Sequence, residues 1–186
     1  MGNRFEETLI RHCAATLAGH KCGSLFSYHP ANGESLDAEI ASVNARLNGK
    51  GVCVRLLKGC SFGGLVLVYR PNKLEKRLSQ PDIRSFLAEQ GYADFSLSAT
   101  LETLSAHIRC GEDFPHEIGI FLDYPLADVI GFIRHKGSGF CCIGCWKVYA
   151  DEKNAKRTFA LYRKCRDVYL SCYHRGFDVA RLTVAA

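Results

Sequence analysis

The sequence contains no apolar run long enough to cross a membrane. Its longest apolar stretches, such as Gly63–Tyr69 and Ile118–Leu122, fall far short of the ~20 residues that a membrane-spanning helix requires. The first residues include Glu6 and Glu7, where a secretory signal peptide would need an apolar segment. We therefore expect a cytoplasmic protein with no membrane association.

Low-complexity segments, internal repeats and Pro- or Ser-rich linkers are also missing. With 186 residues, the chain is long enough for one domain with a sizeable core and short for two. We expect residues 1–186 to form a single globular domain. The net charge of +5 is a mild excess that favours solubility and does not require a nucleic acid partner.

Cysteine, in contrast, is abundant, with ten residues in the chain. In a reducing compartment such residues are free thiols, metal ligands or catalytic groups rather than structural disulfides. Three of them lie in one glycine-rich segment with the only tryptophan, Gly139-Phe140-Cys141-Cys142-Ile143-Gly144-Cys145-Trp146. This segment is the first place to look for chemistry.

The spacing of apolar residues predicts an α/β or α+β fold with a mixed sheet of about five strands flanked by helices. The expected helices cover residues 3–18, 36–47, 72–79, 81–90, 97–109, 125–134, 151–174 and 176–182. The expected strands cover residues 23–28, 52–58, 65–70, 116–122 and 140–149. The glycine-rich segment 59–64 indicates a hairpin between the second and third of these strands.

The cysteine spacing does not match a structural zinc site, which usually combines two close ligand pairs. Cys142 and Cys145 supply one pair, although on a regular strand they point to opposite faces unless Ile143-Gly144 forms a turn. Cys165 and Cys172 are seven residues apart on the expected helix, about 10 Å along its axis, and so cannot share an ion. We predict no metal ligands, and we place both of these cysteines on the apolar face of the helix together with Tyr162, Val168 and Tyr169.

A thiol-dependent enzyme is one alternative, with Cys145 as nucleophile and His116 as base. Gly144 would leave room for a substrate, and Lys147 would lower the pKa of the thiol. Glu117 is badly placed to orient His116, because adjacent residues of a strand face opposite ways.

A non-catalytic interaction module, including a homo-oligomer, is a second alternative. The expected helix 151–174 has a basic side formed by Lys153, Lys156, Arg157, Arg163 and Lys164. Such a stripe is more typical of a solvated face than of a nucleic acid surface, and no aromatic RNA-binding signature accompanies it.

Residues 16–26, 114–125 and 144–149 resemble a bacterial family, a domain of unknown function that is common in anaerobic Gram-positive species. The blocks His116-Glu117-Ile118-Gly119 and Trp146-Lys147-Val148-Tyr149 carry the resemblance, which spans essentially the whole chain. It implies no assigned activity and no known cofactor, and it favours a redox- or metal-linked accessory role, with a redox partner protein. The family pattern is firmest at Lys21, His116, Glu117, Trp146 and Lys147.

These five residues are expected at the ends of strands, where layered folds build pockets. Lys21 and Lys147 would supply positive charge, His116 an acid, base or ligand, and Trp146 a stacking surface. We predict that Lys21, His116 and Trp146 face one hollow that binds a small anionic or planar ligand. The alternative is that Glu117 pairs with one lysine and the other groups only stabilise the fold.

Overall fold

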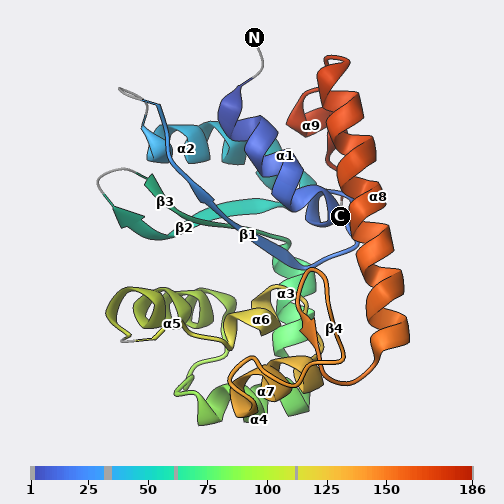
Figure 1. The fold of residues 1–186 in the computed structure, drawn as a ribbon. Helices are drawn as coiled ribbons and strands as arrows, with labels where there is room; N and C mark the ends of the chain where they lie inside the picture. The colour runs from blue at the N-terminus through green and yellow to red at the C-terminus, as the bar shows by residue number, and fades with distance from the viewer. Residues whose placement is uncertain (1–2, 32–34, 61–62, 112, 186) are drawn as a thin grey trace.

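The computed structural model describes residues 3–31, 35–60, 63–111 and 113–185 (Figure 1). The helices are α1 (Arg4–Leu17), α2 (Leu36–Leu47), α3 (Pro71–Leu78), α4 (Pro81–Glu89), α5 (Leu97–Cys110), α6 (Ile118–Phe121), α7 (Leu126–Arg134), α8 (Glu152–His174) and α9 (Val179–Leu182), with a 3-10 turn at Asn48–Lys50. The strands are β1 (Gly23–Tyr28), β2 (Cys53–Cys60), β3 (Gly63–Tyr69), β4 (Cys142–Ile143) and β5 (Lys147–Val148).

The central element is an antiparallel sheet with the strand order β1-β3-β2. Alternate residues of its strands belong to two different cores, since Val66 and Val68 of β3 pack in one core and Leu67 in the other. Figure 1 shows α1 and α2 on one side of the sheet and α3 to α7 on the other. Both faces of this small sheet are therefore buried between helical layers.

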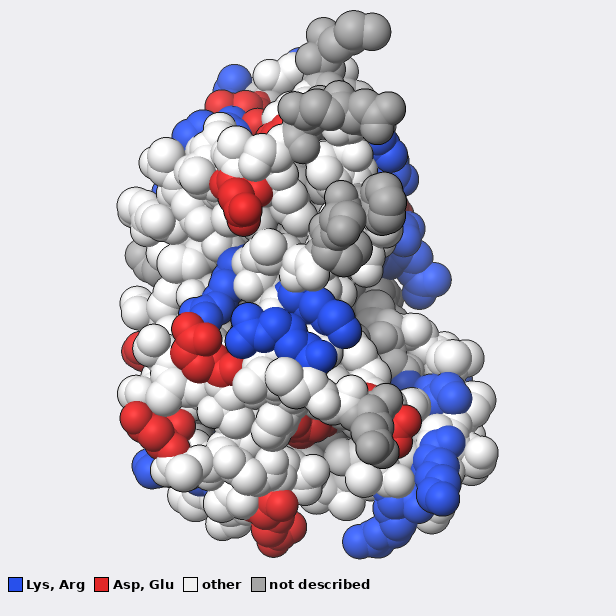
Figure 2. Space-filling view, turned by 90° about the vertical axis from the view of Figure 1, so that its left-hand side faces the viewer, with Lys and Arg blue, Asp and Glu red and all other residues white. Residues whose placement is uncertain are grey.

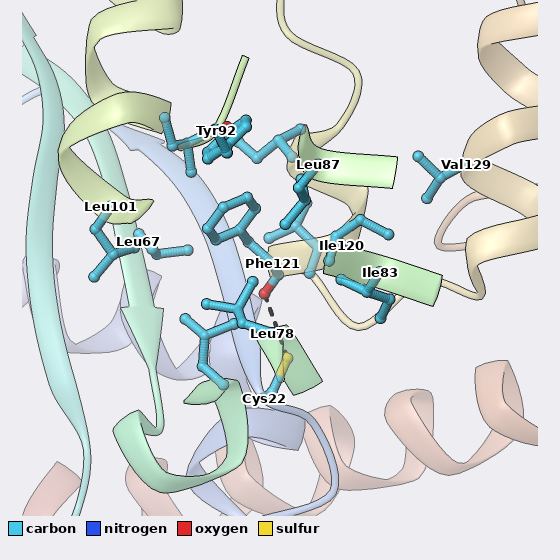
Figure 3. Close-up of a cluster of buried hydrophobic side chains, with 14 of the residues drawn as sticks. Cys22, Leu67, Leu78, Ile83, Leu87, Tyr92, Leu101, Ile120, Phe121 and Val129 are labelled. Carbon is cyan, nitrogen blue, oxygen red and sulfur yellow. Dashed lines mark hydrogen bonds between the residues drawn. The ribbon is translucent and has the colours of Figure 1, made fainter. Parts of the chain in front are cut away.

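The core beneath the sheet joins the helices α3 to α7 to β3 (Figure 3). Phe121 and Tyr92 lie in its middle, with ring centroids 6.1 Å apart. The Cys22 thiol donates a hydrogen bond to the Phe121 carbonyl oxygen at 3.5 Å, which fixes the start of β1 against α6. A Cβ atom on the neighbouring Gly23 would lie 2.4 Å from the same oxygen, so this contact requires glycine.

Helix α8 runs along one edge of the molecule and packs against α1 (Figure 1). Asp151 caps its first turn by accepting a hydrogen bond from the Asn154 backbone at 3.0 Å. Cys165 is buried against Ala14 and Ala15 of α1, while Cys172 is half-buried. The prediction that Cys165 packs as a small apolar residue is confirmed.

The α+β class is confirmed, but the predicted single mixed sheet is wrong. The five strands form two separate antiparallel sheets of three and two strands within the described ranges. The predicted strand 116–122 is the helical turn α6, because a short, fully buried apolar run does not distinguish a strand from a helix. The predicted strand 140–149 is the hairpin β4–β5, which reverses direction after Ile143.

The face opposite α8 carries charges of both signs (Figure 2). Lysine and arginine side chains gather near its centre, with acidic side chains beside them. In this part of the molecule, Arg55 of β2 pairs with Glu102 of α5 at 2.5 Å, and Lys58 donates a hydrogen bond to the Ile108 carbonyl at 3.1 Å. These two contacts attach α5 to the edge strand of the sheet. Throughout the described part of the chain, no helix has the length and apolar character that a bilayer span requires.

Candidate functional site

Two hollows lie on either side of the β4–β5 hairpin. The larger, here called the basic cleft, has a volume of about 790 Å³ and lies between α1, the start of β1 and α8. The smaller, here called the hairpin pocket, has a volume of about 280 Å³ and is bounded by α6, α7 and the hairpin. Tyr124 and residues 143–145 line both hollows, so the turn of the hairpin forms their shared wall.

Lys21 lines the basic cleft from the loop that joins α1 to β1. Its side chain is mostly buried, with the residue 8% exposed, and its Nζ lies 5.3 Å from the centre of the Tyr124 ring and 5.5 Å from that of Tyr162. It forms no hydrogen bond or ion pair with any residue that the structure describes. Burial lowers the pKa of Lys21 from its ordinary value of 10.5, against the opposing effect of nearby thiols and Asp123.

The other buried or half-buried lysines and arginines that the structure describes each donate at least one hydrogen bond. Arg70 donates to three backbone carbonyls, and Arg77 donates to the carbonyls of Ile120 and Tyr124. Lys147 donates to the Gly137 carbonyl at 2.7 Å. Such partners compensate the loss of hydration that burial imposes on a charge. Lys21 lacks this compensation, so its ammonium group is available to a ligand.

The cleft is positively charged. Its described lining contains five lysine and arginine residues and no carboxylate. Three of these cations pair with acidic groups outside the lining: Arg11 with Glu7 at 2.8 Å, Lys156 with Glu152 at 2.5 Å, and Arg166 with Asp167 at 2.9 Å. Lys21 and Arg163 have no such partner among the residues described. An anion entering the cleft would therefore meet two unpaired cations.

The hairpin is fixed by the buried carboxylate of Asp128, in the first turn of α7. Its Oδ2 accepts a hydrogen bond from Trp146 Nε1 at 2.7 Å. Its Oδ1 accepts from the backbone nitrogens of Tyr149 at 2.7 Å and Ala150 at 3.0 Å. One side chain thus orients the indole and the end of the hairpin together, and hydrogen bonds to an ionised group are the strong kind.

Close packing positions Cys145 at the tip of the hairpin. A Cβ atom on Gly144 would lie 2.3 Å from the Phe159 ring of α8, so the glycine allows the turn to approach the helix. The Tyr124 hydroxyl donates to the Cys145 carbonyl at 3.1 Å. Gly144 therefore serves the packing of the turn, whereas the sequence had suggested that it makes room for a substrate.

The environment of Cys145 does not produce an activated thiol. Burial raises the pKa of Cys145, and the opposing effect of Lys21, Arg163 and Arg166 does not reverse the shift. The expectation that Lys147 lowers this pKa is wrong, because the cations that act on the thiol are Lys21, Arg163 and Arg166, while the Lys147 ammonium is held at the Gly137 carbonyl. A thiol kept protonated is a poor nucleophile.

His116 and Glu117 differ in burial, but they lie in the turn before α6 and not on the predicted strand. His116 is exposed and packs against the Phe132 ring at 4.7 Å between centroids. Glu117 is buried and lies 2.8 Å from His107 Nδ1, with the Tyr92 hydroxyl donating to it at 3.3 Å. The partner of Glu117 is thus a histidine of α5, and neither predicted lysine bonds to it.

A family model described as "Protein of unknown function (DUF3793)" matches residues 9–183. The chain belongs to this family. The match covers both hollows and the hairpin between them, and it confirms the resemblance to a domain of unknown function. A comparison with curated proteins found no match, and a comparison with solved structures also found none.

In this DUF3793 chain the predicted site residues are divided between the two hollows, except Glu117, which lines a third hollow beside α5 together with His116. Cys145, His116, Trp146 and Lys147 line the hairpin pocket, and Cys145 also lines the basic cleft. Lys21 lines the basic cleft alone among the predicted ligand-binding residues. Trp146 already stacks on Tyr124 and meets Phe159 edge-on, at centroid distances of 5.0 and 4.5 Å. Most of its ring surface is therefore occupied by the protein itself.

Sequence reasoning missed the residues that complete the DUF3793 site. Tyr162 and Arg163 were placed on opposite sides of the helix 151–174, yet both line the basic cleft. Asp128 gave no signal beyond its position near a helix start. His107 gave no sequence signal at all, because its contact with Glu117 depends on how α5 packs.

No metal centre is evident in the described part of the DUF3793 chain, where no three histidine, cysteine or acidic residues are grouped for one. The turn that would let Cys142 and Cys145 approach one another does exist. The nine cysteines that the structure describes are all free thiols.

Thiol labelling of the folded protein tests the thiol-enzyme alternative. Cys141 and Cys145 are both exposed residues, and we expect iodoacetamide to modify Cys145 no faster than Cys141, because desolvation of its thiol raises the pKa of Cys145. The buried Cys13 and Cys22 should react slowest, since burial raises their pKa values further, to about 12 for Cys22. Peptide mass spectrometry over time gives the rates, and a Cys145 that reacts about tenfold faster than Cys141 would contradict this expectation.

Proposed function

We propose that this protein binds a small anionic ligand with a flat apolar part in the basic cleft. The anion would lie against Lys21 and Arg163, and the flat part against the aromatic residues that line the same cleft. The single observation that supports this most is the buried Lys21 ammonium, which has no hydrogen-bond or ion-pair partner among the described residues.

Charge and shape in the cleft support the same ligand. Tyr124, Phe159 and Tyr162 give it apolar walls beside its five cations. Ligand sites commonly combine apolar walls with a few placed polar groups in a volume of roughly 300–1,000 Å³, and the cleft at about 790 Å³ fits this range. A redox- or metal-linked accessory role, a redox partner and self-association stay predictions from the sequence.

Three probes separate the contributions of charge and ring. Flavin mononucleotide has a phosphate and a flat ring system, riboflavin has the ring system alone, and inorganic phosphate has the charge alone. We expect isothermal titration calorimetry to give tightest binding for flavin mononucleotide, weakening as salt rises. The proposal would be refuted if riboflavin bound as tightly as flavin mononucleotide. It would also be refuted if neither flavin mononucleotide nor inorganic phosphate bound.

Lys21→Met should weaken flavin mononucleotide binding by about tenfold or more, because it removes the unpaired cation and keeps the side-chain length. The matched control is Lys153→Met, since Lys153 is exposed on α8 and does not line the cleft. Equal affinities for the Lys21→Met variant and the wild type would remove Lys21 from the site.

The same variant is expected to be more stable than the wild type. A buried ammonium without hydrogen-bond or ion-pair partners opposes folding, so Lys21→Met should raise the free energy of unfolding by about 1 kcal/mol near neutral pH. Urea unfolding of both proteins measures this difference, and a loss of more than about 1 kcal/mol would point to a structural role for Lys21.

The gain in stability should shrink at alkaline pH. Because the folded-state pKa of Lys21 is lowered, the unfolded chain binds more protons between that value and 10.5. Burying the charged Lys21 therefore destabilises the wild-type protein fully at pH values below the folded-state pKa. This destabilisation decreases as the pH rises through that pKa towards 10.5. Unfolding measured at about pH 7 and about pH 10 should therefore show converging stabilities for the two proteins.

A further inference from the structure

We propose that the Lys21 side chain is a nucleophile that forms a reversible imine with small aldehydes or ketones bearing a carboxylate or phosphate group. This inference rests on the proposed function, because the basic cleft must first bind the anionic group of the compound. It adds a covalent step at one atom, the Nζ of Lys21, and names the class of compound that reacts there.

The bonding of Lys21 differs from that of three other lysines, the half-buried Lys50 and Lys147 and the exposed Lys58. Lys50, Lys58 and Lys147 donate hydrogen bonds to backbone carbonyls at 3.0, 3.1 and 2.7 Å. These bonds hold the three ammonium groups in structural positions. Lys21 has no such bond to a described residue and contacts only the faces of the Tyr124 and Tyr162 rings, so no hydrogen bond must break before its nitrogen attacks a carbonyl carbon.

Burial also increases the reactive form of Lys21. Only the neutral amine attacks a carbonyl group, and burial lowers the pKa of Lys21, which enlarges the neutral fraction near pH 7. Desolvation of a lysine in a largely apolar pocket is an established way to activate it for imine formation. The exposed Lys153 on the surface of α8 lacks this environment.

The two tyrosine rings favour the product as well. A protonated imine carries its positive charge at the same position as the ammonium, 5.3 and 5.5 Å from the ring centres of Tyr124 and Tyr162. The face of an aromatic ring attracts such a cation, and more strongly when water is excluded. The surroundings of Lys21 therefore suit both the lysine and the iminium ion.

The step balances without an oxidant or a reductant. The lone pair of Nζ forms a bond to the carbonyl carbon, and the carbonyl oxygen becomes a hydroxyl group. This hydroxyl leaves as water with the second hydrogen of the amine, so that a carbon–nitrogen double bond forms. Tyr162 lines the cleft, and burial raises the pKa of its hydroxyl group, so it stays neutral during the reaction and the proton for the departing oxygen comes from solvent water.

The charge of the cleft selects the compounds. Arg163 lines the same cleft as Lys21 and has no carboxylate partner in the described chain. A guanidinium group binds a carboxylate or phosphate in a bidentate manner. An anion held there would orient its carbonyl group, which gives anionic carbonyl compounds an advantage over neutral ones.

The test traps the imine in the wild-type full chain. The protein is incubated with pyruvate and sodium cyanoborohydride, which reduces an imine to a stable amine, and the modified lysines are located by peptide mass spectrometry. We expect Lys21 to be modified at least about tenfold faster than Lys153. Acetone, a neutral ketone, should modify Lys21 more slowly than pyruvate does, and excess inorganic phosphate should slow the pyruvate reaction.

Variants separate this inference from anion binding alone. Arg163→Gln should slow pyruvate labelling at Lys21 by about tenfold, a larger reduction than for acetone labelling. If pyruvate labels Lys21 no faster than Lys153 while flavin mononucleotide still binds, the proposed imine is overturned and the proposed anion site remains. Absence of both labelling and anion binding would overturn the imine and the proposed function together.

Discussion

Arg70→Met is expected to lower the free energy of unfolding by about 3–5 kcal/mol, the largest effect of any single substitution considered for this chain. Arg70 is 2% exposed. Its Nε donates to the Thr16 carbonyl at 2.6 Å, and its Nη2 donates to the carbonyls of Leu17 and Val184, both at 2.7 Å. Methionine would fill most of the space and leave all three oxygens without these donors.

The loss is large because of where these carbonyls lie. Thr16 and Leu17 end α1, whose last turn contains no basic residue of its own. Carbonyls at a helix end lack partners within the helix and carry its partial negative charge, so Arg70 supplies both a donor and a cation from another element. The contact with Val184 also attaches the segment after α9 to the sheet.

Two further variants make the Arg70 experiment decisive. Arg134→Met removes an exposed arginine from the last turn of α7 and should change stability by less than about 1 kcal/mol. Arg70→Lys keeps the charge without the planar group, and an intermediate loss is expected. Urea unfolding with a common slope gives all three values, and a loss below about 1 kcal/mol for Arg70→Met would contradict the role described.

Asp128→Asn should loosen the β4–β5 hairpin and lower the free energy of unfolding by about 3 kcal/mol. The amide keeps the shape of the side chain but loses its charge. It also presents an NH₂ group to one of the three donors, Trp146 Nε1 or the backbone nitrogens of Tyr149 and Ala150. A buried donor left without an acceptor is more costly than the average hydrogen bond is worth.

The position of the only tryptophan makes this effect directly measurable. Trp146 is buried in the hairpin, so its fluorescence reports on that segment while circular dichroism reports on the helices. We expect red-shifted emission in the Asp128→Asn variant and a fluorescence transition that precedes the helical one. Coincident transitions and unchanged emission would show that Asp128 is dispensable.

Asp82→Asn is the matched control for Asp128→Asn. Asp82 is exposed and also lies in the first turn of a helix, α4, so it shares the helix-dipole contribution without the hairpin bonds. A change below about 1 kcal/mol is expected for this control.

Elements with strong local signals were predictable from the sequence. Helices α1, α2 and α5 have apolar residues at helical spacing and a capping side chain at the start, in Asn3, Ser35 and Ser96. Strand β1 was predicted with the bounds that the structure gives. For the three helices the decisive interactions lie within a few residues of one another, whereas β1 pairs with the distant β3 and was predicted from its local composition.

Elements that depend on distant contacts were not predictable in this way. The reversal at Gly144 requires the Phe159 ring of α8 beside it and the Asp128 carboxylate of α7 behind it. The helical turn α6 has only four residues, which is too short for a helical period to appear. Neither arrangement leaves a periodic pattern in the local sequence.

The candidate site shows the same division. Lys21 was singled out by the family resemblance, but its neighbours Tyr162 and Arg163 come from a helix about 140 residues later in the chain. The sequence placed one on the apolar side of that helix and the other on the basic side. The boundary between the two sides lines the cleft, and only the packing of α8 against α1 reveals it.

Because Tyr124 and residues 143–145 line both hollows, neither volume is independent of the other. A molecule that pushes the Cys145 turn away from α8 would enlarge the larger space and narrow the smaller one. Occupancy on one side would then lower affinity on the other, and thermodynamic reciprocity requires the two reductions to be equal. The antagonism would be strongest for bulky occupants and would fade for those too small to reach the turn.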